Sequence, residues 1–521
     1  MINKQLFPSA LAVVASACTS LQIADTRTSG TSNAARAEIA VLEGQLSEKA
    51  KVWRSDARVA VANRATENAR STRAKNIILF IGDGMDPTTV TAARIYAGQQ
   101  AGRDGESNTL SFEEFPNLAL AKTYTTDFQV PDSAGTATAM LTGVKTRSGV
   151  LGVSEEVETG NCASGLATKI PTIGEYAEIY GLSTGVVSTA ALTHATPASL
   201  YAHTASRDWG ADSNIPEDQR ADGCVDIAKQ LIDFPYGDGI DVAMGGGRAH
   251  FTAKSKSDPE SDQMGARTDN VDLAAVWASK SDDHVAVTNL ADMRAAANSA
   301  KLLGLFEHGH MKYELDRKND KAGEPSLAEM TEKAISILSN DEDGFFLLVE
   351  AGRIDHAHHA GNAKRALHDT VALADAVTIA RTMTSEKDTL IIVTADHGHT
   401  LSIQGYPARA NDILDIVKVR EDDGTLAPLR ARGDGQNYTT LSYANGPGAQ
   451  FEKSSDQNRP NVTSADALGD DYKQQALIAT GSETHGGQDV PVYASGPGAH
   501  LVSGVMEQNV IFQIMMDAYG W

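Results

Sequence analysis

Three short apolar runs, each followed by side chains that can bind a metal ion, constrain the fold of this chain most strongly. Residues 76–82 lead into Asp83, residues 345–349 into Glu350, and residues 390–395 into Asp396 and His397. Apolar runs without alternation are typical of strands buried on both faces of a parallel sheet, and ligands of such sheets gather beyond the carboxyl ends of the strands. One such carboxylate is commonly a helix cap or a turn residue. Because three runs share the pattern, we predict an α/β fold whose metal ligands converge on one crevice.

A second group of candidate ligands follows the middle run, in the segment from Glu350 to His359. This segment is predicted to be helical, and side chains four residues apart, such as Asp355 and His359, fall on one helix face. His356 points to a neighbouring face. Imidazole and carboxylate together suit Zn²⁺. The alternative is a surface histidine cluster that binds adventitious metal, and Glu350 at the start of the segment weakens that interpretation.

Oxygen ligands indicate a second kind of metal. A set of carboxylate and hydroxyl oxygens around Glu350 and Asp83 would suit Mg²⁺, which prefers such hard ligands and water. The sequence therefore predicts zinc and magnesium in one site.

The candidate nucleophile is Ser133, in a turn that enters a helix of small residues between Val130 and Met140. Free backbone N–H groups and the positive end of the helix dipole at a helix N-terminus favour a phosphate or an alkoxide. An ordinary serine N-cap is the alternative. The sequence pattern alone leaves both open.

Several of these residues lie in seven short blocks that occur in a fixed order along the chain. The blocks are Gly82–Met85, Asp132–Ala134, Thr193–Pro197, His203–Arg207, Glu350–His359, Thr394–His397 and Thr484–Gly487. A single tripeptide is weak evidence, whereas seven ordered blocks placed at strand ends are specific. In these blocks the chain resembles the alkaline phosphatase family, over almost the whole chain after its first residues. The resemblance implies hydrolysis of phosphate monoesters through a phosphoserine intermediate.

The resemblance also implies two zinc ions and one magnesium ion per chain, with their ligands. The zinc ligands would be Asp355, His359 and His485 for the first ion, and Asp83, Asp396 and His397 for the second. The magnesium ligands would be Asp83, Thr196 and Glu350.

Four further residues complete the implied site. Ser133 would attack phosphorus beside the second zinc, and Arg207 would clamp the phosphate. His194, close to the magnesium, and His356 occupy positions that vary within the family, and this pair resembles animal members. Some bacterial members carry Asp and Lys at these two positions. Because histidine in place of that lysine removes a fixed positive charge at alkaline pH, we expect looser product binding.

Other substrate classes use the same metal scaffold. A sulfatase needs Cys or Ser in a Cys/Ser-x-Pro-x-Arg motif, which the block at Ser133 lacks. A phosphodiesterase usually presents Thr and has no arginine clamp, so Ser133 together with Arg207 favours monoesters. A structural, non-catalytic envelope protein would need closed and typically Cys-rich zinc sites, and neither implied zinc set contains Cys.

The cysteines and the N-terminus favour an oxidising compartment. Cys162 and Cys224 match a disulfide position of the animal relatives; two isolated buried thiols are the alternative. Residues 1–17 have the charge and the short apolar core of a signal peptide. Cys18 follows small residues and could carry a lipid. We therefore expect a periplasmic or extracellular enzyme, either soluble or anchored to the envelope as a lipoprotein.

The formal net charge of −23 opposes binding to long polyanions, so we do not expect a nucleic-acid partner. A small phosphate monoester can still be drawn to a local cluster of metal cations.

Changes in composition along the chain predict its organisation. A tail and helical arm would span residues 18–74, the α/β core residues 75–405 and 482–521, and a crown-like insertion residues 406–481. In animal-type relatives an N-terminal helix embraces the partner subunit, so we expect a homodimer; a solubilising tail is the alternative. The polar stretch 251–283 could hold an additional calcium ion.

Overall fold

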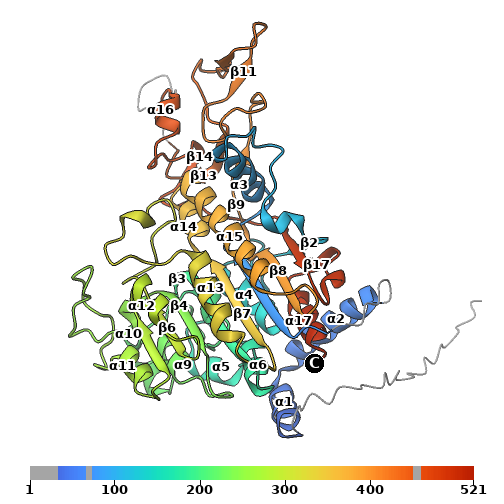
Figure 1. Cartoon of the computed structure of the whole chain (residues 1–521), viewed down its shortest axis with the longest axis vertical. Helices are drawn as coiled ribbons and strands as arrows, with labels where there is room; N and C mark the ends of the chain where they lie inside the picture. The colour runs from blue at the N-terminus through green and yellow to red at the C-terminus, as the bar shows by residue number, and fades with distance from the viewer. Residues whose placement is uncertain (1–32, 66–72, 450–458) are drawn as a thin grey trace, which may run out of the picture.

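The computed structural model describes residues 33–65, 73–449 and 459–521, and its centre is a ten-stranded sheet (Figure 1). Most neighbouring strands are parallel, and β16 runs antiparallel to both of its neighbours. In spatial order the strands are β17 (Gly504–Glu507), β2 (Asn117–Lys122), β16 (Val490–Ser495), β8 (Thr389–Ala395), β1 (Asn76–Gly82), β7 (Phe345–Ala351), β3 (Ser183–Ala191), β4 (Val242–Gly246), β6 (Lys301–Leu305) and β5 (His284–Val287). The predicted α/β fold with a mostly parallel sheet is confirmed.

The three apolar runs form β1, β7 and β8, which lie side by side with β1 in the middle. Gly82 at the end of β1 pairs with Ala351 of β7 and with Ala395 of β8. Nearly every side chain of these strands is buried, so both faces of the sheet are covered. Because the strands end in register, the residues that follow them emerge at one edge of the sheet.

Helices cover the sheet in two groups. α13 and α15 pack on each other and cross the front of the sheet in Figure 1, whereas α4, α6 and α17 pack together in a separate group. The longer helices are α1 (Asn33–Gln45), α2 (Glu48–Ala65), α3 (Pro87–Gln100), α4 (Ser133–Thr142), α13 (Leu327–Leu338), α15 (Ala363–Met383) and α17 (Val510–Tyr519). The shorter helices are α5 (Cys162–Ala167), α6 (Ile173–Ile179), α7 (Ala195–Ala198), α8 (Glu217–Ala221), α9 (Ile227–Ile232), α10 (Arg248–Phe251), α11 (Leu273–Ala278), α12 (Leu290–Ala295), α14 (Arg353–His359) and α16 (Ser464–Ala467).

Two helices begin at the edge where the central strands end. α4 begins at Ser133, as expected, and the Asp132 side chain caps it by accepting a hydrogen bond from the Gly135 N–H. α14 begins at Arg353, three residues later than the predicted start of the helical segment. Glu350 belongs instead to β7, because the apolar strand continues through it to Ala351.

The N-terminal helices pack against the core of their own chain. The guanidinium of Arg54 in α2 is buried and donates hydrogen bonds to the carbonyl oxygens of Thr142 (3.0 Å) and Pro171 (2.9 Å). α2 also packs against α17 (Figure 1). The predicted signal peptide, residues 1–17, and Cys18 lie outside the described residues. Within the described part of the chain, no helix combines the length and the apolarity required to cross a bilayer.

The segment between β8 and β16 forms small sheets of its own, at the top of Figure 1. β10 (Leu401–Ile403), β13 (Leu441–Gly446) and β14 (Ala476–Ala479) form one of them, and β11 (Lys418–Arg420) pairs with β12 (Leu426–Pro428). At the base, β9 (Gly398–His399) pairs with β15 (His485–Gly486). This short ribbon places His485 beside the end of β8.

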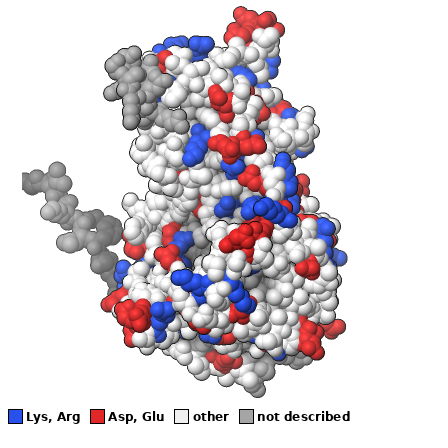
Figure 2. Space-filling model, turned by 90° about the vertical axis from the view of Figure 1, so that its left-hand side faces the viewer, with Lys and Arg blue, Asp and Glu red and all other residues white. Residues whose placement is uncertain are grey.

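Acidic and basic side chains are interspersed over the face of the molecule shown in Figure 2. Blue and red groups alternate there, and the described part of this face carries no continuous basic band.

Candidate metal centre and nucleophile

Two carboxylates and one imidazole meet beside Ser133 at the ends of β1 and β8. The Nε2 atom of His397 lies 3.4 Å from Asp83 Oδ1 and 3.3 Å from Asp396 Oδ2. Ser133 Oγ lies 3.1 Å from the same nitrogen and 3.5 Å from Asp83 Oδ1. All four side chains are buried. We call Asp83, Asp396 and His397 the carboxylate-rich set.

Burial dominates the electrostatics of the carboxylate-rich set. Burial, followed by repulsion from Asp396, raises the pKa of Asp83 well above its ordinary value. Burial likewise raises the pKa of Asp396 and holds the pKa of His397 well below its usual range. Without a cation, the protein thus disfavours the charged form of every member. A divalent ion would reverse this preference for the two carboxylates and reinforce it for His397, because a metal binds ionised carboxylates and neutral imidazole.

A histidine-rich set, Asp355, His359 and His485, lies next to the first set. Asp355 Oδ1 is 3.2 Å from His359 Nε2 and 3.3 Å from His485 Nε2, and the two nitrogens are 3.1 Å apart. The Nδ1 atoms donate to backbone carbonyls, His359 to Glu483 (2.6 Å) and His485 to Pro131 (2.7 Å). In neutral imidazoles both Nε2 atoms then carry lone pairs. Two lone pairs and a carboxylate oxygen that converge in this way fit a bound cation.

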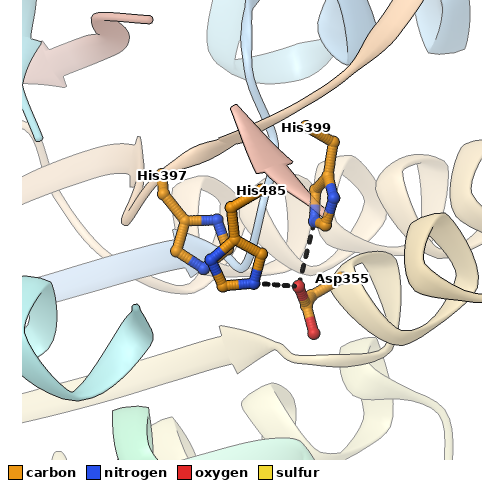
Figure 3. A group of neighbouring side chains, drawn as sticks. All are labelled: Asp355, His397, His399 and His485. Atoms are coloured by element: carbon orange, nitrogen blue, oxygen red, sulfur yellow. Dashed lines mark hydrogen bonds and ion pairs between the residues drawn. The ribbon is translucent and has the colours of Figure 1, made fainter. Parts of the chain in front are cut away.

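His399 is a buried contact of the histidine-rich set that the sequence analysis missed. Its Nε2 lies 2.9 Å from Asp355 Oδ1 (Figure 3), and its Nδ1 lies 2.6 Å from Glu483 Oε2. Although burial acts to lower the pKa of His399, these two carboxylates raise it to about 10. The spacing of two residues from His397 at the end of a strand could have suggested that both rings reach one site.

Figure 3 also shows how the two sets adjoin each other. The rings of His397 and His485 stack with their centroids 3.6 Å apart, and Asp355 and His399 lie beside them. Burial acts to raise the pKa of Asp355, but the hydrogen bonds that the surrounding imidazoles donate when they are protonated hold it well below its usual range. The histidine-rich set is therefore internally compensated without a metal.

Each of the three predicted magnesium ligands has a buried oxygen atom without a hydrogen-bond partner among the described residues. These atoms are Asp83 Oδ2, Thr196 Oγ1 and Glu350 Oε1. The Ser188 hydroxyl, which the sequence analysis did not single out, donates to the other oxygen of Glu350. Burial raises the pKa of Glu350 to about 7, partly offset by this hydrogen bond. Unpaired buried oxygens are costly unless a cation binds them, and oxygen ligands suit Mg²⁺.

Three histidine rings line the side of the site near Arg207. His194 Nε2 lies 3.1 Å from a guanidinium nitrogen of Arg207, and the Nδ1 atoms of His194 and His356 are buried without a partner in the described structure. His310, which the sequence analysis missed, has its ring centroid 4.1 Å from that of His356. His310 Nδ1 accepts a hydrogen bond from the Ala191 N–H at 3.0 Å. It lies in a loop, where no spacing pattern points to it.

Arg207 is held beside the N-terminus of α4 by Asp132. Its guanidinium donates to Asp132 Oδ2 at 2.9 Å, and its backbone N–H donates to the Gly149 carbonyl at 2.8 Å. Asp132 also caps α4, so one carboxylate aligns the arginine with the helix that begins at Ser133. The predicted clamp and the predicted nucleophile are thereby placed together.

The predicted disulfide between Cys162 and Cys224 is present, with a Cα–Cα distance of 5.6 Å. It ties α5 to the loop that follows α8.

The fold and the site together define a class: an α/β protein with metal-binding groups around a serine at a helix N-terminus. The family model described as alkaline phosphatase matches residues 74–520, so the chain belongs to the alkaline phosphatase family, whose members are metal-dependent phosphomonoester hydrolases.

Individual relatives agree with the family assignment. The chain is 44% identical over 476 residues to the tissue-nonspecific isozyme of alkaline phosphatase from Rattus norvegicus, covering 89% of this chain and 88% of the relative. It is 42% identical over 479 residues to the same isozyme from Homo sapiens, covering 90% and 88%. The crystal structure of Thermus thermophilus alkaline phosphatase superposes with a TM-score of 0.61 at 25% identity, covering 88% of this chain and 94% of that one.

Proposed function

We propose that this alkaline phosphatase cleaves phosphate monoesters with Ser133 as nucleophile, at a site holding two zinc ions and one magnesium ion per chain. The observation that carries the proposal is the position of Ser133 Oγ, 3.1 Å from His397 Nε2 and beside groups of buried carboxylate, imidazole and hydroxyl atoms that could bind metal ions. The donor types fit the metals: imidazole with carboxylate for zinc, oxygen for magnesium.

The three donor sets would be occupied as follows. Asp355, His359 and His485 would hold one zinc, Asp83, Asp396 and His397 the second, and Asp83, Thr196 and Glu350 the magnesium. When bound, these ions lower the pKa of the serine hydroxyl and neutralise charge on the departing ester oxygen.

The protein's own groups position the phosphoryl group. Arg207 presents two guanidinium nitrogens to two non-bridging oxygens, and the N-terminus of α4 offers backbone N–H groups to the same anion. Asp132 keeps the guanidinium in place through its hydrogen bond. Because monoester hydrolysis offers little covalent work to the protein, this positioning and charge stabilisation supply most of the catalysis.

The reaction would proceed by two displacements at phosphorus. Ser133 Oγ attacks in line, the bond from phosphorus to the ester oxygen breaks, and the alcohol leaves with a proton. A water oxygen then attacks the phosphoserine from the vacated side, and the bond to Ser133 Oγ breaks. Inorganic phosphate is released, and two inversions retain the configuration at phosphorus.

The arginine clamp favours monoesters over diesters. A monoester offers Arg207 two non-bridging oxygens and keeps another for the metals, whereas a diester has one oxygen fewer. His194 and His356 beside the clamp carry no fixed charge at alkaline pH, and burial lowers both pKa values well below the usual range. These two histidines support the proposal that product phosphate is held loosely.

An additional calcium ion is proposed near the stretch 251–283. Asp258 and Glu260 from this stretch pair with Arg248 at 2.5 and 3.1 Å, and Glu307 pairs with Lys312 close by. Burial, followed by a hydrogen bond to Asp320, raises the pKa of Glu260, as expected where carboxylates crowd together. Oxygen donors of this kind suit Ca²⁺.

The proposed assembly is a homodimer. Residues 1–17, the proposed signal peptide, and Cys18, the proposed site of a lipid anchor, lie outside the described residues. Apolar side chains on the edge strand β17 and on its neighbour β2 support a partner, because Leu118 and Val505 are more than half exposed and Val505 pairs with the partly exposed Leu120. Apolar surface gathered in one place commonly marks an interface. The division into residues 18–74, 75–405, 406–481 and 482–521 belongs to the same proposal.

Hydrolysis of p-nitrophenyl phosphate and of the bis-ester at alkaline pH, for the wild type and Ser133→Ala, tests the proposal. We expect monoester turnover to dominate, to fall by about 10⁴-fold or more in the variant, and to require about two zinc ions per chain by metal analysis. Full turnover by Ser133→Ala would exclude the nucleophile. A preference for the bis-ester would make the chain a phosphodiesterase of the same superfamily, and zinc bound without any turnover would indicate a structural metal protein.

A further inference from the structure

Glu483 lies behind the histidine-rich set and contacts both His359 and His399. We propose that Glu483 is the positioning residue of this set, fixing two of its ligands and tying them to both ends of the insertion that carries the small sheets. The inference rests on the proposed function, since it assumes that Asp355, His359 and His485 hold zinc.

The side chain of Glu483 acts on Asp355 through one imidazole. Its Oε2 atom accepts a hydrogen bond from His399 Nδ1 at 2.6 Å, and His399 Nε2 donates to Asp355 Oδ1 at 2.9 Å. Glu483 and His399 are completely or almost completely buried, so water does not compete for these hydrogen bonds. The chain of contacts fixes which way the Asp355 carboxylate faces, as partners behind metal ligands generally do.

The backbone of Glu483 acts on a second ligand directly. Its carbonyl oxygen accepts the hydrogen bond from His359 Nδ1 at 2.6 Å, and its N–H donates to the His359 carbonyl at 2.9 Å. The first contact fixes the tautomer of His359 and leaves Nε2 free for a metal. One residue therefore orients Asp355 by its side chain and His359 by its main chain, two positions before His485.

The remaining oxygen of Glu483 closes the insertion at its base. Oε1 accepts hydrogen bonds from the backbone N–H and the hydroxyl of Thr400, at 2.7 and 2.6 Å. Thr400 precedes β10, the first strand of the insertion sheets, and Glu483 follows β14, the last one. Any displacement of one end of the insertion is thus transmitted to the Asp355 carboxylate. A purely structural carboxylate would need only the Thr400 contacts.

Zinc affinity of the metal-free protein, measured by competition with a chromophoric chelator, tests the inference without relying on activity. We expect Glu483→Ala to weaken one zinc site by about 10- to 100-fold and to leave the other unchanged, as found for partners behind metal ligands. Glu483→Gln should stay within about threefold of the wild type, because its amide can still accept from Thr400 and meet the neutral ring of His399. If Glu483→Ala does not fold, Glu483→Asp, too short to reach both partners, should show the same loss in part.

Glu175 provides a matched control. It is similarly buried, its carboxylate lies 2.7 Å from His203 Nε2, and it accepts a backbone hydrogen bond from Thr172, but it lies outside the zinc sets. Glu175→Ala should lose thermal stability and keep both zinc affinities. If Glu483→Ala or Glu483→Asp behaves in the same way, the inference is wrong.

Asp355→Asn separates failure of the inference from failure of the proposed function. If Asp355→Asn also keeps both zinc affinities, the histidine-rich set is not a zinc site and the proposed function fails. If Asp355→Asn loses one zinc and Glu483→Ala does not, only the positioning role of Glu483 is refuted.

Discussion

The two proposed zinc sets lie side by side but are built in opposite ways. The carboxylate-rich set follows β1 and β8 directly and is fully buried. The histidine-rich set takes its members from α14 and from the ribbon after the insertion, and the side chains of His359 and His485 remain 31% and 16% exposed. The sheet register places the first set, whereas contacts between distant segments assemble the second.

The two sets also differ in how the protein shifts the pKa values of their carboxylates. Burial raises the pKa values of Asp83 and Asp396, so the carboxylate-rich set resists charging in the absence of a cation. Asp355 is surrounded by imidazoles that lower its pKa, so the histidine-rich set tolerates an empty state. Loss of metal should therefore destabilise the folded protein more at the carboxylate-rich set than at the histidine-rich set.

The largest expected effect comes from removing the carboxylate shared between the buried zinc and the magnesium. Asp83→Asn should lose about two metal ions per chain and lower kcat by at least ~10³-fold, or about 4 kcal/mol, because charge stabilisation disappears on both sides of Ser133. Metal analysis and initial rates measure this. Asp369→Asn, at a buried carboxylate of α15 that is not among the proposed ligands, is the control, and equal metal loss in both variants would refute the proposed role of Asp83.

An intermediate effect is expected in the order of metal loss. A chelator should remove zinc from the wild type in two phases, the faster from the accessible histidine-rich set, with rates that differ by about tenfold or more, since exposed sites open at little cost. Stopped-flow absorbance of a chromophoric chelator resolves the phases. His485→Ala should abolish the fast phase and keep the slow one. If the slow phase is the one that disappears, the order of accessibility is reversed.

The smallest effect concerns pH and the stability of the metal-free protein. The pKa of Glu350 is raised from 4.5 to about 7 in the folded state. The folded protein then binds more protons than the unfolded one, so stability is lost as pH rises from 4.5 to 7, by on the order of 3 kcal/mol from this group. Bound metal should cancel the loss.

Calorimetry of metal-free protein at pH 5 and pH 8 measures the change. Glu350→Gln should flatten the dependence relative to the wild type, and the gap in Tm between metal-loaded and metal-free wild type should widen with pH. An equally steep fall in stability for wild type and Glu350→Gln would show that Glu350 is not the source.

Much of the carboxylate-rich set could be predicted from the sequence, for a physical reason. A doubly buried parallel strand is a continuous apolar run, and residues after it must emerge at the carboxyl edge. Asp83, Asp396 and His397 follow such runs directly, and the three runs are neighbours in the sheet. Ser133 could likewise be placed, because a turn followed by small helix-forming residues indicates where a helix begins. The start of α14 was placed too early, since β7 continues through Glu350.

The sequence by itself determined the strand ends, the α/β fold and the types of ligand available, because these depend on hydrophobic pattern and local chemistry. Only the tertiary structure decided that His399, Glu483 and Ser188 reach the same centre, and that His310 lies beside His356. Their positions depend on the pairing of β9 with β15 and on the path of loops between strands. Such contacts join segments far apart in the chain, so no local spacing encodes them.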